Sequence, residues 1–238
     1  MLLNTQQFNV SGTQPLVVLH GLFGAQDNWR SQALVWARDR RVITMDLRNH
    51  GLSDHHHSMD YASMAEDVHH TLGSLDLGLE KVDLLGHSMG GKVAIQFALN
   101  YPQKLRSLLV ADIAPVPYEP RHEAILTGLN SIDLAQLKSR KQALDLLSAY
   151  EPDPRVCQFL LKSLYKNADG QFALRYNLVA IETNYQAISA APSTEIRGAF
   201  EGPTLVIKGA NSAYILPQHK TSFDAILPNT QLKIMTGC

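Results

Sequence analysis

The chain has 238 residues, of which 45% are hydrophobic and 18% are charged, a composition that suits one globular domain with a sizeable core. Its 21 basic and 22 acidic residues almost cancel and are spread along the chain, so charge gives no reason to expect binding to nucleic acid or to an anionic membrane. The first residues do not resemble a signal peptide, no apolar run is long enough to span a membrane, and Cys157 and Cys238 lack the spacing of metal ligands; we therefore expect a cytoplasmic location.

Six short apolar runs, rich in β-branched residues, predict the strands of a sheet. They are Leu16–Leu19, Val42–Met45, Val82–Leu85, Leu108–Ala111, Thr204–Ile207 and Leu232–Met235. Their nearly continuous apolar character indicates that most of them are covered on both faces, as in a parallel sheet. Between them, Tyr61–Leu75 and Met89–Asn100 have the spacing of helices. This alternation predicts an α/β fold with a doubly wound, mostly parallel sheet.

Residues 115–200 interrupt the alternation. They begin with PVPYEP, show helical patterns at Ile132–Tyr150 and Val156–Tyr165, and contain no convincing strand. After Gly202-Pro203 the strand and helix pattern resumes. We therefore predict a core formed by residues 1–114 and 201–238, and a helical cap formed by residues 115–200 over one edge of the sheet. The alternative is a run of ordinary packing helices, since periodicity alone does not place them.

The segment Gly86-His87-Ser88-Met89-Gly90 fits the Gly-x-Ser-x-Gly pattern of a nucleophile elbow. Five residues of this kind arise by chance, but here a predicted strand precedes them and a predicted helix follows. Such a turn strains the serine backbone and exposes the hydroxyl at the positive end of the helix. We predict that Ser88 is a nucleophile, the alternative being a packing turn, and that His87 borders the substrate pocket.

A second glycine-containing turn, His20-Gly21-Leu22-Phe23-Gly24, follows the first predicted strand and can fold back beside the elbow. We predict that the backbone N–H groups of Leu22 and Met89 form an oxyanion hole, and that Phe23 lines the pocket. The alternative is a turn without a catalytic role. His55–His57 is predicted to be a surface loop and not a metal site, because no acidic or cysteine partners complete a ligand set.

The segments HGLFG, DLRNHGLSD, GHSMGGK and ADIAP occur in this order and resemble the α/β-hydrolase superfamily, and within it the YbfF-like bacterial esterases. The resemblance is dense over residues 16–115 and looser near the strand at 204–207. It implies an α/β-hydrolase fold and a serine hydrolase that cleaves short acyl esters, with acyl-CoA thioesters as an alternative, through an acyl-enzyme and without a cofactor. Two other functions stay open: C–C bond hydrolysis or a cofactor-free lyase step, and a non-catalytic binding module.

The acid of the expected triad has one good candidate. Many relatives carry it after the strand that here ends in Lys208, but this sequence has Gly209-Ala210-Asn211-Ser212 there and no carboxylate. Asp112 follows the preceding strand, an arrangement that resembles the YbfF-like esterases, and we predict that it is the acid. The alternative is that Asp112 braces the entrance of the cap. Arg121, at the start of the cap, is predicted to reach the substrate.

The base is harder to place. In this fold the catalytic histidine follows the last strand, and here that strand is followed by Thr236-Gly237-Cys238. The ten histidines lie in earlier loops, in helices or in the cap, so none is well placed. We therefore expect the base beyond Cys238, and a chain that lacks normal esterase activity as it stands. The sequence does not indicate the oligomeric state.

Overall fold

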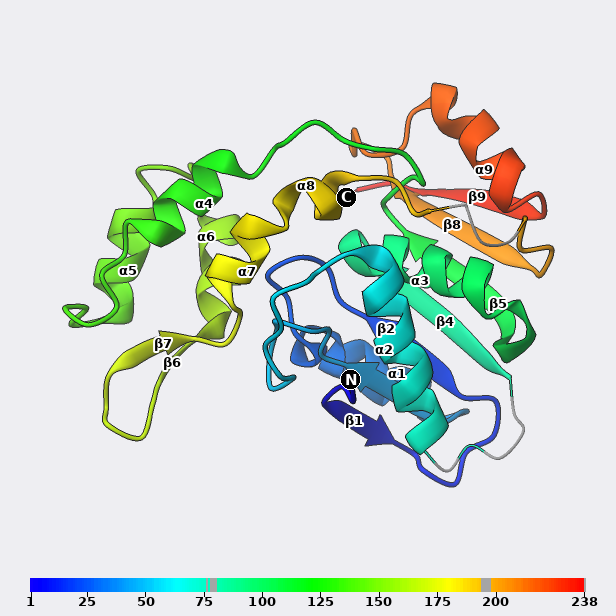
Figure 1. Ribbon diagram of the computed structural model, residues 1–238, viewed down its shortest axis with the longest axis horizontal. Helices are drawn as coiled ribbons and strands as arrows, with labels where there is room; N and C mark the ends of the chain where they lie inside the picture. Colours follow the sequence, from blue (N-terminus) through cyan, green and yellow to red (C-terminus); the bar gives the residue numbers. More distant parts are fainter. Residues whose placement is uncertain (76, 78–80, 194–197, 238) are drawn as a thin grey trace.

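The computed structural model describes residues 1–75, 77, 81–193 and 198–237, and within them seven strands form one sheet (Figure 1). The strands follow the order β1-β3-β2-β4-β5-β8-β9, and only β1 runs antiparallel to its neighbour. Their bounds are Thr5–Phe8 (β1), Leu16–Leu19 (β2), Val42–Met45 (β3), Val82–His87 (β4), Leu105–Ala111 (β5), Thr204–Gly209 (β8) and Thr230–Met235 (β9). The predicted mostly parallel α/β sheet is confirmed, and β1 is an edge strand that the sequence patterns missed.

Helices cover both faces of this sheet, as the continuous apolar strands indicate. Along β2, Leu16 and Val18 pack in a small cluster with residues of α1, while Val17 and Leu19 pack in the main core with α2 and α3. The alternation follows from the two-residue period of a strand. The helices of this part of the chain are η1 (Gln26–Trp29), α1 (Arg30–Trp36), α2 (Tyr61–Ser74), α3 (Met89–Asn100), η2 (Pro102–Lys104), η4 (Pro217–His219) and α9 (Lys220–Ile226).

The strand β9 is an exception to the covering that was predicted for most of the strands. It lies at the edge of the sheet beside β8, and the side chains of Leu232 and Ile234 are 54% and 57% exposed. An apolar run therefore does not by itself prove burial, because the side chains of a strand are covered only where other elements pack on the faces of the sheet.

Between β5 and β8 the chain leaves the sheet and returns to it, and we call residues 115–200 the insertion; its residues 194–197 lie outside the described part. Figure 1 shows it as an arm, from green to yellow, that extends beyond the sheet. It contains α4 (Glu123–Asn130), α5 (Arg140–Leu147), α6 (Pro154–Leu160), η3 (Leu161–Ser163), β6 (Leu164–Lys166), β7 (Phe172–Leu174), α7 (Leu178–Thr183) and α8 (Tyr185–Ser189).

Two expectations for the insertion are wrong in detail. A short antiparallel hairpin of β6 and β7 occurs where no strand was expected. The helix expected over Ile132–Tyr150 is limited to α5, because Ser139 accepts a hydrogen bond from the Gln142 N–H and so caps a helix that begins only at Arg140.

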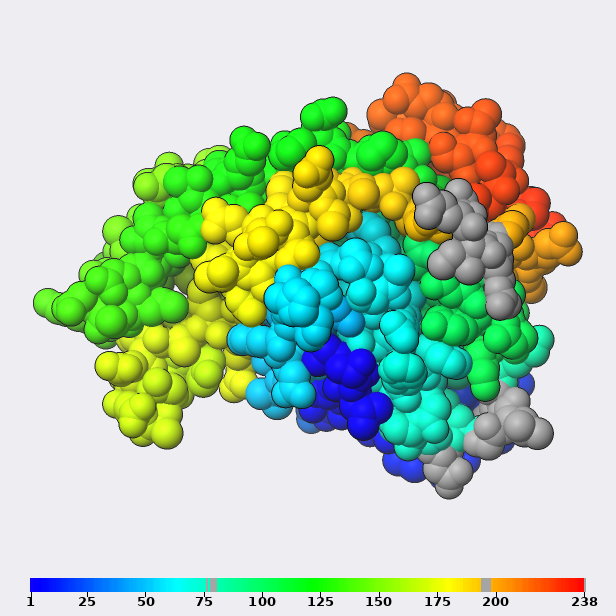
Figure 2. Space-filling model, in the orientation of Figure 1, coloured from blue at the N-terminus to red at the C-terminus, as the bar shows by residue number. Residues whose placement is uncertain are grey.

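The returning part of the insertion lies against α2. Figure 2 shows the yellow residues of α7 and α8 in contact with the cyan residues around α2. The Tyr61 hydroxyl of α2 donates a hydrogen bond to the Ile188 carbonyl of α8, and the Asn184 side-chain amide donates to the His57 carbonyl at 2.8 Å. These contacts hold the insertion close to the carboxyl ends of the central strands.

Candidate active site

Ser88 occupies a sharp turn between a strand and a helix. The strand β4 ends at His87 and α3 begins at Met89, so Ser88 alone separates them. Its φ of 51° and ψ of −120° belong to a region that L-residues rarely adopt, which is the strained geometry of a nucleophile elbow. The Ser88 N–H donates to the Ala111 carbonyl at 2.9 Å, and the Ser88 carbonyl accepts from the Gly91 N–H at 2.8 Å. The backbone therefore fixes the position of the hydroxyl.

The glycines around Ser88 are required by close backbone contacts. A Cβ at Gly86 would lie 2.1 Å from the Gly90 carbonyl oxygen, and a Cβ at Gly90 would lie 2.4 Å from the His20 carbonyl oxygen. Both distances are far below van der Waals contact. The Gly-x-Ser-x-Gly pattern is thus explained here by the approach of β4, α3 and the loop after β2.

A pair of buried histidines joins the loops that follow β2 and β3. The Leu47 N–H donates to His20 Nε2 at 3.0 Å, and the Phe23 N–H donates to His50 Nε2 at 3.1 Å. The two rings lie 5.0 Å apart between centroids. Burial lowers the pKa of His20 to about 4 and that of His50 to about 3, so both rings are neutral at pH 7 and accept these hydrogen bonds. This histidine pair sets the shape of the loop that carries Leu22.

Two backbone N–H groups beside Ser88 have the properties of oxyanion donors. Leu22 and Met89 both line the same small cavity as Ser88. Within the described residues, no hydrogen bond from the N–H of Leu22 or Met89 is found, whereas the Phe23 N–H is taken by His50. Unpaired N–H groups of residues that line a cavity together with a nucleophile are suited to a developing negative charge, and the oxyanion role of Leu22 and Met89 stays a prediction.

Asp112 follows β5 and has a φ of 57°. Its N–H donates to the Ile207 carbonyl at 2.8 Å, and its Oδ1 accepts a hydrogen bond from the Gly209 N–H at 3.2 Å. Asp112 thus spans the ends of β5 and β8 and lines a cavity together with Ser88. These contacts suit both a triad acid and a structural brace, so its catalytic role stays a prediction.

Two cavities meet at Ser88. The smaller, of about 50 Å³, lies between the strand ends and the insertion, and Tyr118, Tyr185 and Ile188 form part of its wall. The larger, of about 440 Å³, is lined by residues of the loops after β2, β4 and β5, including Trp29. The side chains that line both are Leu22, Ser88, His122 and Tyr214. Ser88 is therefore placed where two parts of one substrate could diverge.

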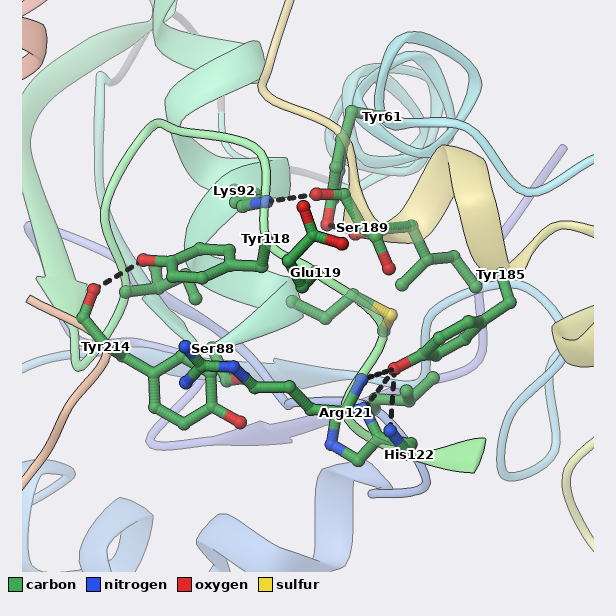
Figure 3. A pocket seen from close by; sticks show the side chains of 14 residues that line it. Tyr61, Ser88, Lys92, Tyr118, Glu119, Arg121, His122, Tyr185, Ser189 and Tyr214 are labelled. Carbon is green, nitrogen blue, oxygen red and sulfur yellow. Dashed lines mark hydrogen bonds between the residues drawn. The ribbon is translucent and has the colours of Figure 1, made fainter. Parts of the chain in front are cut away.

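Tyrosine hydroxyls hold the insertion side of the small cavity in place (Figure 3). The Tyr185 hydroxyl accepts hydrogen bonds from the N–H groups of Arg121 and His122 at 3.2 and 3.0 Å. The Tyr118 hydroxyl donates to the Tyr214 carbonyl at 2.5 Å, and the Arg121 guanidinium lies 5.3 Å from the Tyr214 ring centre. Side-chain contacts between residues far apart in the sequence thus form this wall of the small cavity.

The predicted substrate-binding residues have different positions. Arg121 lines the small cavity and His87 lines the large one. Phe23 lines neither of these two cavities: it is 4% exposed and packs against the Tyr176 ring at 5.2 Å. The structure therefore places Phe23 in the core against Tyr176, and its contact with substrate stays a prediction.

No described residue forms a hydrogen bond with the Ser88 hydroxyl, and this includes all ten histidines. His87 and His122 are in the cavity walls, but His122 Nδ1 is bonded to the Tyr185 hydroxyl at 2.5 Å. The base that the sequence led us to expect beyond Cys238 lies outside the described residues and stays a prediction.

Other polar motifs have structural partners. The Asp46 carboxylate accepts a hydrogen bond from the Gln26 N–H at 2.7 Å, and Arg48 forms an ion pair with Asp67 at 2.6 Å. The Arg140 guanidinium donates a hydrogen bond to the Leu161 carbonyl at 2.8 Å. In the described ranges, no group of three His, Cys, Asp or Glu side chains could hold a metal ion. No helix there is long and apolar enough to cross a membrane.

Comparisons with known proteins agree with this geometry. A family model described as an alpha/beta hydrolase fold matches residues 14–238. "Esterase YbfF" of Escherichia coli is 33% identical over 96% of this chain and 87% of its own length. "sn-1-specific diacylglycerol lipase ABHD11" of Danio rerio is 37% identical over 90% of this chain and 68% of its own length. A solved structure titled "Marine microorganism esterase" superposes with a TM-score of 0.95 at 36% identity, covering 100% of this chain and 92% of that one. The chain belongs to the α/β-hydrolase family, and the predicted resemblance is confirmed.

Several cavity residues were missed from the sequence, chiefly Lys92, Tyr118, Tyr185 and Tyr214. A signal existed for Lys92, because it is the one charged residue in the helix Met89–Asn100 and lies one turn from Ser88. The tyrosines offered none, since their positions depend on how the insertion folds back.

Proposed function

We propose that the protein is a carboxylic ester hydrolase in which Ser88 attacks a short acyl ester and forms an acyl-enzyme. One observation carries this proposal: a strained serine with an unpaired hydroxyl shares a cavity with two N–H groups that have no acceptor within the described residues. The names of the related esterases and lipases support ester hydrolysis in general.

In this mechanism the Ser88 oxygen adds to the ester carbonyl as its proton passes to a base. The carbonyl oxygen becomes an oxyanion, and the N–H groups of Leu22 and Met89 stabilise it. Collapse of this intermediate releases the alcohol and leaves an acyl-serine, which water hydrolyses to the acid. We assign Asp112 to orient the base and stabilise its charged form, and we assign no described histidine as the base.

The size of the small cavity supports a short acyl group. Its volume is about 50 Å³, against about 440 Å³ for the larger cavity, so we assign the short acyl group to the small cavity. The larger cavity of about 440 Å³ is free to take the leaving group, whether an alcohol or a thiol such as that of CoA.

The test is a chain-length series of p-nitrophenyl esters and acyl-CoA thioesters, assayed with wild-type protein and with Ser88→Ala. Imidazole is added in a parallel series, because a free base in solution supports a serine that has no bonded histidine. We expect Ser88-dependent hydrolysis that is fastest for acetyl and propionyl groups and increases with imidazole.

Mass spectrometry after mixing with substrate should show one acyl group on Ser88. Hydrolysis that is equal in wild-type protein and in Ser88→Ala, with or without imidazole, would overturn the proposal. A maximum at eight or more carbons would overturn the assignment of the small cavity to the acyl group.

A further inference from the structure

Lys92 is a buried lysine that the mechanism above does not use. It lies one helical turn after Ser88 in α3, is 1% exposed, and lines the small cavity. Within the described residues no carboxylate forms an ion pair with it. Lysine is rarely buried without such a partner, because removing an ammonium from water is costly. Its contacts therefore require an explanation.

Those contacts all involve the point where the insertion leaves the core and returns to it. Lys92 Nζ donates to the Ser189 carbonyl at 3.2 Å (Figure 3) and to the Ala190 carbonyl at 2.5 Å, and both carbonyls belong to the returning chain. It also lies 4.7 Å from the ring centre of Tyr118, in the departing chain, and 5.5 Å from that of Tyr61.

The departing and returning chains also bond to each other at this point. The Tyr118 N–H donates to the Ser189 carbonyl at 2.9 Å, so this oxygen accepts both from Tyr118 and from Lys92. One turn further along α3, the Gln96 amide exchanges two hydrogen bonds with the Ser193 backbone, at 2.6 and 3.1 Å. Helix α3 thus holds the insertion with two side chains that lie one turn apart, Lys92 and Gln96. Of these two, only Lys92 is ionisable and lines the small cavity.

We propose that Lys92 is a positioning residue that locks the two ends of the insertion onto the nucleophile helix and thereby sets the depth of the small cavity. The part of this proposal that concerns substrate rests on the proposed function. The lock itself does not, because it is a property of the folded chain. The ammonium or amine holds the carbonyls of Ser189 and Ala190, and these residues adjoin Ile188 in the cavity wall.

The lock has a defined dependence on pH. Burial lowers the pKa of Lys92 to about 7, while a lysine that reaches water has an ordinary pKa of 10.5. Between these values the opened state binds more protons than the locked state. Raising the pH from 7 towards 10.5 therefore favours the locked state, by at most about tenfold in the opening equilibrium per pH unit. Below pH 7 both states are protonated and the dependence vanishes.

Other ionisable groups around the cavity come from each packed element. They are Tyr61 of α2, Tyr118, Glu119, Arg121 and His122 of the departing chain, Tyr185 of α8, and Tyr214. Burial raises the pKa of Tyr61, Tyr118 and Tyr214 above 10 and lowers that of His122 below 6.5. These four side chains therefore do not change their protonation state between pH 7 and 9. Glu119 is exposed and forms no ion pair with Lys92.

Hydrogen exchange of the Tyr118 amide tests the lock without any need for catalysis. Wild-type protein, Lys92→Met and Lys92→Arg are compared between pH 6.5 and 9, after correction for intrinsic exchange. In the wild type we expect the protection factor to rise from pH 7 to 9 by at least tenfold. In both variants it should stay flat, because methionine does not titrate and arginine stays charged. Gln96→Leu is the matched control, which should lower protection at every pH and keep the slope.

Selectivity is the second readout. The ratio of kcat/KM for a hexanoyl ester to that for an acetyl ester cancels any titration of the catalytic base. We expect this ratio to fall several-fold from pH 7 to 9 in the wild type and to stay constant in the two Lys92 variants. If the protection factor of the Tyr118 amide rose with pH in both variants as it does in the wild type, the lock would be overturned. A normal slope without Ser88-dependent hydrolysis would leave the lock standing and refute the proposed function.

Discussion

Two walls of different construction face each other across Ser88. The strand-end wall consists of the turns after β2, β4 and β5, and it carries Leu22, Ser88 and Asp112. The insertion wall consists of Tyr118, Arg121, His122 and Tyr185. In the strand-end wall, backbone conformation fixes the polar groups: Ser88 and Asp112 have φ values of 51° and 57°. In the insertion wall, side-chain hydroxyls and ring contacts hold the chain.

The difference suggests a division of labour. Strained backbone turns persist only where the surrounding fold determines them completely, and they hold reacting groups within fractions of an ångström. Side chains that reach across a cavity can be exchanged or shifted without disturbing the sheet. Changes in the strand-end wall should therefore affect rate or stability, and changes in the insertion wall should affect the choice of substrate.

The largest effect is expected at Ser88. Ser88→Ala removes a single hydroxyl that no described residue bonds, so the fold should be unchanged while the Ser88-dependent hydrolysis that imidazole supports is lost. Initial rates with p-nitrophenyl acetate measure the loss, and circular dichroism and thermal unfolding check the fold. A variant that keeps more than about a few per cent of the rate would show that the elbow is not the catalytic nucleophile.

Asp112→Asn should have the next largest effect on rate. Asparagine tolerates the positive φ at this position and keeps an oxygen that can accept from the Gly209 N–H, so the change isolates the charge. If Asp112 stabilises a charged base, kcat should fall by about 10⁴-fold in protein that contains this base. Ser212→Ala, in the loop after β8 where many relatives carry the acid, is the control and should change the rate little. The opposite ranking of the two variants would show that Asp112 is only a brace.

Gly90→Ala tests the packing of the strand-end wall. The new Cβ would lie 2.4 Å from the His20 carbonyl oxygen and 2.8 Å from that of Leu19, so the free energy of unfolding should fall by about 3 kcal/mol or more. Gly73→Ala in α2 is the control, since no atom lies within 4 Å of its Cβ, and it should stabilise by about 0.5–1 kcal/mol. Urea unfolding distinguishes them. Equal stability of the two variants would mean that the elbow is less tightly packed than described.

The buried pair His20 and His50 predicts that the free energy of unfolding decreases at acid pH. Because the folded pKa values of His20 and His50 lie below the ordinary 6.5, the unfolded chain binds more protons between pH 6.5 and about 4. Their contribution to stability is complete above pH 6.5 and is lost as the pH falls, by about 1.4 kcal/mol per unit for each ring. Unfolding measured at pH 7, 6 and 5 should show this slope in wild-type protein.

His50→Gln should reduce the slope by about one proton, while its amide oxygen can still accept from the Phe23 N–H. The same slope in the variant and the wild type would mean that His50 is not buried and neutral.

The smallest effect is expected in the insertion wall. Arg121→Gln removes a guanidinium that lies 5.7 Å from the Tyr118 ring centre and 5.3 Å from that of Tyr214. Such contacts contribute about 0.5–1 kcal/mol, so relative kcat/KM values for acyl and leaving groups should change several-fold. The rate with the best substrate should change by less than the ratio between substrates. A uniform loss of rate for every substrate would instead place Arg121 in the chemical step.

The sequence alone determined the sheet and the elbow. All six predicted strands were found, and α3 has the bounds Met89–Asn100 that were predicted. Both succeed for a local reason. A buried parallel strand must be apolar along its whole length, and a turn with close backbone contacts requires glycine at fixed spacing. The hairpin of β6 and β7 and the shortness of α5 escaped detection because capping and pairing outweighed helical periodicity there.

Tertiary structure decided which side chains face Ser88 and which withdraw from it. Phe23 adjoins the predicted oxyanion donor in sequence, yet the turn directs it into the core against Tyr176. Lys92 binds a carbonyl 97 residues away, and no local pattern reports such a contact. Contacts of this range depend on the path of the whole insertion across the sheet, whereas periodicity and turn chemistry depend on a few neighbouring residues. The nucleophile could therefore be predicted from the five residues of the elbow pattern, whereas the residues that line the cavity beside it could be identified only from the folded structure.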